Sequence, residues 1–292
     1  MPAVKNSVHP HVESLLDNVV WSALTGPQAH LAVGGPAAWR YPADIAPFCA
    51  VRDLSSDSMD ALARLTVGDD HVTLFADEVP ELVQAFELVK CATVLQMVLK
   101  SDTRTRLDPR LVSLGRAGDQ EMFDLAAETK PGPFRRRTAE LGVFFGLRIQ
   151  GTLAAMAGER MRVEGATEVS AVCTRDAYRG RGYAALLVEG VANVIRHRGE
   201  TPFLHVFESN RPAVSLYERL GFSVRKTHRV VGAKKLENKW PHVQQDGLNL
   251  FLTLPPEEAV KAHPELAPAH ASLEAVRRRL TTSACLSRSS SL

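Results

Sequence analysis

The sequence predicts an α/β fold, because strand patterns and helix patterns alternate between Glu168 and Phe222. The stretch opens with the residue-by-residue alternation of a strand and passes through a glycine-containing turn into apolar residues at helical spacing. A second short apolar strand and a second amphipathic helix follow. In chain order the expected elements are a strand at 168–174, a turn at 179–184, a helix at 184–195 ended by Gly199, a strand at 203–207, and a helix started by Asn210-Arg211-Pro212 and capped by Gly221.

The first of these strands has two predicted faces. Strict alternation would place Val169, Ala171 and Cys173 on one face, and Glu168 and Val172 on the other. A cysteine in such a position packs against its neighbours more often than it acts as a nucleophile, so Cys173 is interpreted as a packing residue.

Residues 1–108 are predicted to form an N-terminal lobe of short elements without a catalytic signature. This part has no glycine-rich phosphate turn and no paired acid–base residues, so we expect it to support the sheet rather than to carry chemistry. Its expected elements are a helix at 11–21, strands at 28–33 and 37–41, a helix at 57–65, a strand at 72–76 and a helix within 79–99.

Residues 109–254 are predicted to form the working domain, and residues 255–292 a tail that is partly helical or disordered. The remaining expected elements of this domain are a strand at 111–114, a helix starting at Asp119, a hairpin of 143–149 and 153–162 around Gln150-Gly151, and closing strands at 222–231 and 248–252.

The turn from Arg179 to Ala184 has the features of a phosphate-binding site. The first N–H groups of a helix lack intrahelical acceptors, and the helix dipole favours negative charge there. Gly180 and Gly182 would let the backbone approach a pyrophosphate, and Arg179 and Arg181 add positive charge. The turn does not end in Gly-Lys-Ser/Thr, which excludes a Walker A loop.

A dinucleotide-binding fingerprint, G-x-G-x-x-G/A, is formally satisfied by Gly180, Gly182 and Ala185, with Glu200 downstream. The rest of the chain is too short and too irregular for the further strand–helix units of a doubly wound domain. A dinucleotide-binding oxidoreductase therefore stays open as a lesser alternative.

Two motifs in the same stretch resemble the GCN5-related N-acetyltransferase (GNAT) superfamily, most closely its FR47-like branch. The turn resembles the signature Arg/Gln-x-x-Gly-x-Gly/Ala through Arg179, Gly182 and Ala184. The second helix resembles N-x-x-A-x-x-x-Y-x-x-x-G-F, and the matching residues are Asn210, Ala213, Tyr217, Gly221 and Phe222. The resemblance is specific over 168–222 and extends loosely over 110–254.

The resemblance implies a GNAT fold, with a mixed central sheet flanked by helices. It implies an enzyme: an acetyl-CoA-dependent N-acetyltransferase in which an amine attacks the thioester directly, without a metal. A non-catalytic acyl-CoA-binding or regulatory module is the alternative. For the N-terminal lobe the resemblance suggests a degenerate second GNAT half, with an unrelated supporting lobe as the alternative.

The resemblance also implies which residues bind the co-substrate. In GNAT folds the strand before the signature turn diverges from its neighbour and exposes backbone groups to the pantetheine arm. The residues implied are Val172, Cys173 and Thr174 through their backbone, Arg179, Gly180, Arg181, Gly182, Tyr183 and Ala184 around the pyrophosphate, and Asn210, which orients the arm, caps its helix or does both.

Two residues are candidates for the proton transfers of such a reaction. Tyr217 matches the family tyrosine that acts as general acid, with a half-buried tyrosine on an amphipathic helix as the alternative. Glu168 resembles the base glutamate of some members, and partial burial would raise its pKa toward the working range. Its alternative is a strand-edge carboxylate in water or in an ion pair.

The acceptor amine, a small molecule or a peptide, is not defined by any motif. Arg135, Arg136 and Arg137 lie where acceptor loops of the resembling family usually sit, and they would attract an acidic acceptor unless they are a solvated helix start. His205 is interpreted as a packed or hydrogen-bonded strand residue.

Composition limits the partners. The chain has 35 basic and 33 acidic residues, so its net charge is only +2. This charge does not imply a positive field over the whole protein that would attract nucleic acid. Four scattered cysteines without C-x-x-C spacing indicate a reducing compartment. The sequence shows no metal-ligand cluster, no apolar leader and no run of membrane-spanning length. We therefore expect a cytoplasmic monomer or homodimer that binds neither nucleic acid nor membrane.

Overall fold

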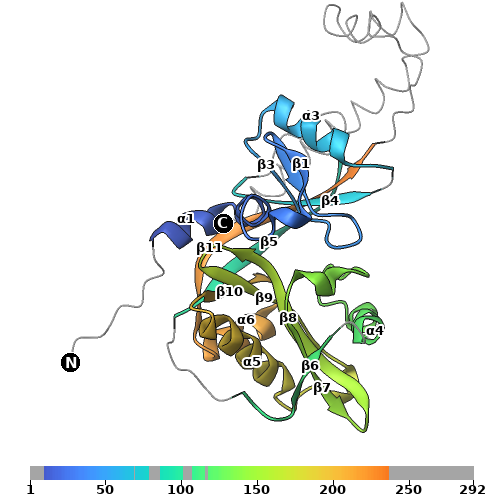
Figure 1. Ribbon diagram of the computed structural model, residues 1–292, viewed down its shortest axis with the longest axis vertical. Coiled ribbons are helices and arrows are strands. Elements are labelled where there is room, and N and C mark those ends of the chain that lie inside the picture. Colours follow the sequence, from blue (N-terminus) through green and yellow to red (C-terminus); the bar gives the residue numbers. More distant parts are fainter. Residues whose placement is uncertain (1–9, 69, 79–85, 101–106, 116–117, 237–292) are drawn as a thin grey trace, which may run out of the picture. The chain divides into compact units, whose positions relative to one another are not determined.

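The computed structural model describes residues 10–68, 70–78, 86–100, 107–115 and 118–236 (Figure 1). The N-terminal elements are α1 (Pro10–Asp17), α2 (Val19–Leu24), β1 (Val33–Gly35), β2 (Ala38–Arg40), β3 (Cys49–Val51), α3 (Ser56–Leu65), β4 (His71–Ala76) and β5 (Phe86–Leu99). The later elements are β6 (Leu111–Leu114), α4 (Asp119–Thr129), β7 (Phe144–Ile149), β8 (Thr152–Val163), β9 (Ala166–Thr174), α5 (Tyr183–His197), β10 (Thr201–Phe207), α6 (Arg211–Arg219) and β11 (Phe222–Lys235).

Eight of these strands form one sheet in the order β4-β11-β5-β10-β9-β8-β7-β6, and β1, β2 and β3 form a small second sheet. In the large sheet β9 and β10 run parallel, and the other neighbouring strands are antiparallel. This topology confirms the expected mixed sheet. It does not provide the parallel, doubly wound sheet that a dinucleotide-binding oxidoreductase needs.

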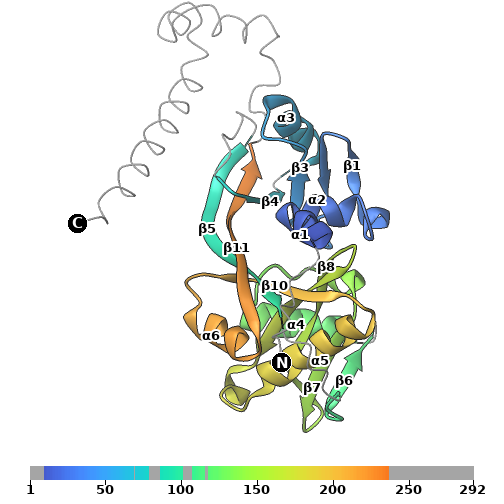
Figure 2. The same cartoon turned by 90° about the vertical axis from the view of Figure 1, so that its left-hand side faces the viewer.

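Helices cover both faces of the large sheet (Figure 2). The apolar sides of α5 and α6 pack on one face, where Leu187, Val191 and Tyr217 join the core cluster. The opposite face is covered by α4 near β7 and β8, and by α1 and α2 further along, where Leu16 packs with Phe203. The N-terminal lobe thus packs on the face of the sheet opposite α5 and α6 and helps to bury it.

The predicted helix within 79–99 is wrong where the structure describes it, because residues 86–99 form the strand β5. β5 pairs with β11 on one side and with β10 on the other. Its residues 94–99 are buried on both faces and are apolar except for Gln96, so their periodicity does not separate strand from helix. The sheet therefore combines strands from both sides of the predicted domain boundary at 108/109, which stays a prediction.

The N-terminal elements differ from the sequence prediction at two places. The strand expected at 28–33 is wrong, because Ala29–Leu31 form a 3₁₀ turn and only Val33 enters β1. The helix expected at 11–21 is interrupted at Asn18, whose side chain accepts a hydrogen bond from Trp21 N and starts a second helix. The strand expected at 248–252 and the tail at 255–292 lie outside the described residues.

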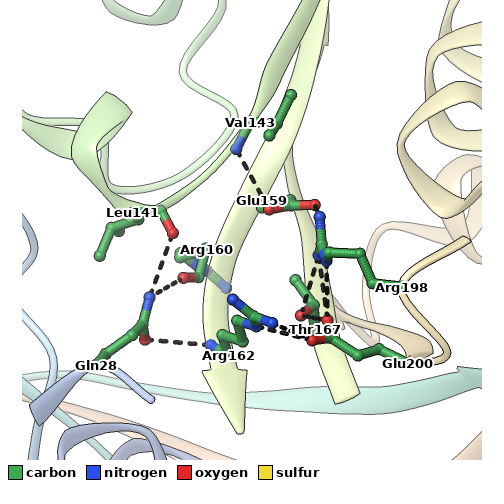
Figure 3. Close-up of polar contacts among 9 residues, drawn as sticks. All are labelled: Gln28, Leu141, Val143, Glu159, Arg160, Arg162, Thr167, Arg198 and Glu200. Carbon is green, nitrogen blue, oxygen red and sulfur yellow. Dashed lines mark hydrogen bonds and ion pairs between the residues drawn. The ribbon is translucent and has the colours of Figure 1, made fainter. Parts of the chain in front are cut away.

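Gln28 anchors the N-terminal lobe to β8 (Figure 3). A bulge in β8 shifts its pairing with β9 between Glu159 and Arg162. The buried Gln28 amide donates to the carbonyl oxygens of Leu141 (3.3 Å) and Arg160 (2.7 Å), and its oxygen accepts from Arg162 N at 3.1 Å. The side chain thus satisfies backbone groups that a regular ladder would pair.

We expect Gln28→Ala to lower the free energy of unfolding by about 2–3 kcal/mol, because it leaves these buried backbone groups without partners. Denaturant unfolding monitored by circular dichroism measures the change. Gln120→Ala is the control, since Gln120 is exposed and its side chain, within the residues that the structure describes, bonds Asp124 on its own helix. Equal stability of the two variants would contradict the anchoring role.

Candidate functional site

β9 and β10 diverge and form a fork in the centre of the sheet. They pair at Ala166 with Thr201 and at Glu168 with Phe203, and no later pair joins the two strands, although both are described to their ends. The β10-facing backbone groups of β9 beyond Glu168 are therefore not used by the ladder. They are available to an extended ligand that lies between the strands like an added strand.

A bulge in β9 corrects the predicted faces of this strand. Ser170 pairs with Gly158 and Cys173 with Met156, so β9 carries one extra residue, and Ala171 takes a left-handed φ of 52°. Val169 and Val172 consequently pack on the α5 side, whereas Ala171 and Cys173 pack on the α4 side. Strict alternation from Val169 to Cys173 was wrong because the bulge shifts the side-chain phase by one residue.

The Cys173 side chain lies among the apolar residues under α4. Burial raises the pKa of its thiol to about 11, so the thiol is protonated at neutral pH. This environment agrees with a packing side chain, and only the Cys173 backbone lies on the fork.

The turn after β9 leaves the N-terminus of α5 open. Gly180 and Gly182 have φ values of 75° and 78°, and a Cβ built on either would meet no atom within 4 Å. Glycine is thus required by the left-handed backbone, and the space above it is free. Gly182 stands at the N-cap position and provides no side-chain acceptor for the first amides of α5. Those amides and the helix dipole together favour the binding of an anion at this end of the helix.

The two arginines of this turn lie at the surface beside it. The Arg179 guanidinium pairs with the Asp176 carboxylate at 2.9 Å, and both side chains are exposed. The Arg181 guanidinium lies 5.6 Å from the centroid of the Tyr178 ring. Neither cation is committed to a buried partner, so both can turn toward an anion at the helix N-terminus.

Glu168 lies at the vertex of the fork and is fully buried. Its Oε1 contacts Arg160 Nη2 at 2.5 Å and His205 Nδ1 at 2.7 Å, and its Oε2 accepts from Arg160 Nε at 2.8 Å and Met161 N at 3.3 Å. Each carboxylate oxygen therefore has two partners, which uses its acceptor capacity.

The expected rise in the pKa of Glu168 is wrong. Burial raises the pKa of this carboxyl, but the charges and hydrogen bonds of Arg160 and His205 outweigh burial and lower the pKa to about 2. A carboxylate this acidic, with no acceptor site left, is a weak base. The geometry favours the alternative interpretation, an ion pair, and this pair joins β8, β9 and β10 where the fork begins.

Tyr217 and Asn210 belong to the helix that follows β10. The Asn210 side chain accepts from Ala213 N at 3.3 Å, so it caps α6, one of its two predicted roles. Tyr217 is buried in the cluster under α5 and α6, with its ring 6.1 Å from that of Phe222. Burial raises the pKa of its hydroxyl to about 12, which keeps the proton on the oxygen at neutral pH.

The three consecutive arginines divide into two groups. Arg137 pairs with Asp44 at 3.2 Å and with Glu140 at 2.8 Å. Arg135 and Arg136 instead line a hollow together with residues of the N-terminal lobe. Sequence reasoning missed these lobe residues, because no motif connects them with the arginines and only the tertiary fold brings them together.

Comparisons with known sequences agree with this geometry. Residues 144–231 match the family model described as FR47-like protein. A mycothiol acetyltransferase from Corynebacterium aurimucosum is 41% identical over 64 residues, which are 22% of this chain and 21% of that protein. One from Corynebacterium glutamicum is equally similar over 64 residues. The matched segment thus spans about a fifth of the length of these curated relatives.

Solved structures extend the similarity over most of the described chain. A GNAT-family protein from Novosphingobium aromaticivorans is 39% identical, with a TM-score of 0.72 over 76% of this chain and 99% of that one. A GCN5-related N-acetyltransferase from Kribbella flavida shares the fold at 14% identity, with a TM-score of 0.51 over 82% of this chain and 98% of that one.

Proposed function

The chain belongs to the GNAT acetyltransferase superfamily and contains an FR47-like domain, and we propose that it transfers an acetyl group from acetyl-CoA to an amine by direct attack. The observation that carries this proposal is the fork between β9 and β10, which leads straight to the open N-terminus of α5. An acyl-CoA needs both features, because its extended pantetheine arm and its pyrophosphate must be bound together.

The residues present fit an acyl-CoA. The backbone of Val172, Cys173 and Thr174 borders the fork, and the glycine turn leaves free space where a pyrophosphate would lie. We assign the same turn residues as the sequence predicts, Arg179, Gly180, Arg181, Gly182, Tyr183 and Ala184, to the pyrophosphate. Asn210 caps α6 and thereby holds the helix beside the fork. When bound, the co-substrate supplies the acetyl group as a thioester.

We assign the role of general acid to Tyr217. Its hydroxyl carries a proton at neutral pH, as proton donation to a leaving thiolate requires, and burial, which raises its pKa to about 12, makes it a weaker acid than an exposed tyrosine. We leave Glu168 out of the proton transfers, because its carboxylate is saturated by Arg160 and His205. The acceptor amine then loses its proton to solvent or to another group before it attacks.

The location and assembly of the protein stay proposals. Cys49, Cys91 and Cys173 are free thiols, as a cytoplasmic protein would have. Among the described residues no helix combines the length and the apolarity needed to cross a membrane. We propose that the protein is a monomer or a homodimer and that it does not bind nucleic acid.

The test of the proposed function is release of free coenzyme A thiol from acetyl-CoA in the presence of an amine panel, together with calorimetric binding of coenzyme A. Thiol release that depends on an amine would support an enzyme. Tight coenzyme A binding without thiol release for any amine would favour the non-catalytic module.

Tyr217→Phe is expected to lower kcat about 10²-fold, with coenzyme A affinity unchanged, because it removes only the hydroxyl group that carries the acidic proton. The loss should not recover at high pH, since no base is missing. Ser215→Ala, on the exposed side of the same helix, is the control and should behave like the parent. A Tyr217→Phe enzyme with parental kcat would exclude this residue as the acid.

A further inference from the structure

A hollow of about 550 Å³ lies between the N-terminal lobe and the segment after α4. Phe123 comes from α4, and Phe134, Arg135 and Arg136 follow this helix. The facing side includes Asp44 and Asp70, the first between β2 and β3 and the second just before β4. Residues from distant parts of the sequence therefore line one hollow.

Hydrogen bonds hold the two sides of this hollow together. Arg137 N donates to Asp44 O at 2.9 Å, and the Arg137 guanidinium pairs with the Asp44 carboxylate at 3.2 Å. The buried Thr138 hydroxyl donates to Ile45 O at 2.7 Å and also accepts from Arg135 N at 2.6 Å. The backbone that carries Arg135 is thus held in place against the lobe.

The charges of the hollow do not balance. Asp70 is paired with Arg40, and Asp44 shares the Arg137 guanidinium with Glu140, so both acidic side chains of the hollow already have a cationic partner. Within the described part of the chain, Arg135 and Arg136 have no carboxylate partner. A ligand would therefore meet two guanidinium groups that are not paired with a described carboxylate, and guanidinium groups bind carboxylates well.

The hollow also has an aromatic surface. The Arg136 guanidinium lies 5.5 Å from the centroid of Phe123, and the Phe134 ring meets Phe144 edge-on at 5.8 Å. Phe134 belongs to the same apolar cluster as Ala171 and Cys173, the two side chains that the β9 bulge turns toward α4. The hollow is therefore connected by packing to the α4 side of the fork.

We propose that this hollow binds the acceptor, and that the acceptor is an amine that also carries a carboxylate beside an apolar or aromatic group, as amino acids and short peptides do. Arg135 and Arg136 would hold the carboxylate, and Phe123 and Phe134 the apolar group, with the N-terminal lobe as one wall of the site. This inference rests on the proposed N-acetyltransferase function.

The test compares carboxylates with carboxamides of the same shape. The full chain saturated with coenzyme A is titrated in a calorimeter with L-phenylalanine, L-leucine and Phe-Leu dipeptide, each paired with its C-terminal amide. We expect the carboxylates to bind about ten-fold or more tightly than the amides, and the preference to weaken with salt. Arg135→Gln/Arg136→Gln should abolish the preference.

Arg64→Gln is the matched control, because it removes an exposed cation from α3 and should leave the preference unchanged. Thermal unfolding of both variants verifies their folding. Equal binding of carboxylates and amides, binding of no member of the panel, or a preference that persists in the double variant would overturn the inference.

Thiol release with the same panel separates this inference from the proposed function. If thiol release is as fast with the amides as with the carboxylates, the proposed transferase function stands and the proposed carboxylate-bearing acceptor is wrong. If the hollow binds carboxylates preferentially but no thiol is released, the carboxylate-binding site stands and the proposed transferase function is wrong.

Discussion

Glu168→Gln is expected to lower the free energy of unfolding by about 3–5 kcal/mol, because it breaks a buried ion pair and leaves one partner uncompensated. Glu168 is fully buried, and the side chains of Arg160 and His205 are 12% and 3% exposed. Glutamine removes the charge that compensates the guanidinium, and its NH2 group cannot accept from the donors that contact the second carboxylate oxygen. Chemical denaturation of the parent and the variant at neutral pH measures the loss.

The same change should alter the acid sensitivity of the protein. The folded-state pKa of Glu168 is lowered from 4.5 to about 2, so its ionised form stabilises the fold fully above pH 4.5. That stabilisation is lost as the pH falls from 4.5 toward 2. The difference in unfolding free energy between parent and Glu168→Gln should therefore shrink over this range.

Kinetics of Glu168→Gln separate a structural residue from a base. Glu189→Gln, an exposed glutamate on α5, is the control for loss of one carboxylate. If Glu168 forms a structural ion pair, we expect the Glu168→Gln variant to be less stable and to bind coenzyme A more weakly than the parent. Its kcat should not recover at high pH. A stable variant whose kcat falls about 10²-fold and recovers in alkali would instead identify Glu168 as the base.

Gly182→Val is expected to weaken coenzyme A binding by about 100-fold or more, because a branched side chain would occupy the free space over the α5 N-terminus. Each charge-assisted hydrogen bond to the pyrophosphate contributes about 1.5–3 kcal/mol, so the loss of two such bonds would account for an affinity about 100-fold weaker. Arg179→Ala removes one such contact and should cost about 1.5–3 kcal/mol of binding. Isothermal titration with coenzyme A measures both.

Gly199→Val is the matched control for backbone strain. Gly199 stands just beyond the other end of α5 with the same φ of 78°, and a Cβ there also meets no atom within 4 Å. Valine at either position should destabilise the fold to a similar extent, since both impose a left-handed backbone on a branched residue. Only Gly182→Val should impair binding. Normal coenzyme A affinity in folded Gly182→Val and Arg179→Ala would remove the turn from the site.

The sequence by itself determined the stretch from β9 to α6 and the family to which it points. Helical periodicity, a glycine turn before α5 and a capping Asn210 are local features, and the structure confirms each of them. Local patterns are reliable here because turn geometry, capping and amphipathic spacing depend on residues a few positions apart.

Only the tertiary structure decided the rest. β5 is a strand because β10 and β11 pair with it from more than 100 residues away, and no periodicity within its doubly buried run reveals that. A single extra residue at Ala171 reversed the faces of β9 after Ser170. The pKa of Glu168 fell rather than rose because Arg160 and His205, 8 and 37 positions away, converge on a buried carboxylate. Pairing partners, bulges and the charges around a buried group are properties of long-range contacts, which a local pattern does not contain.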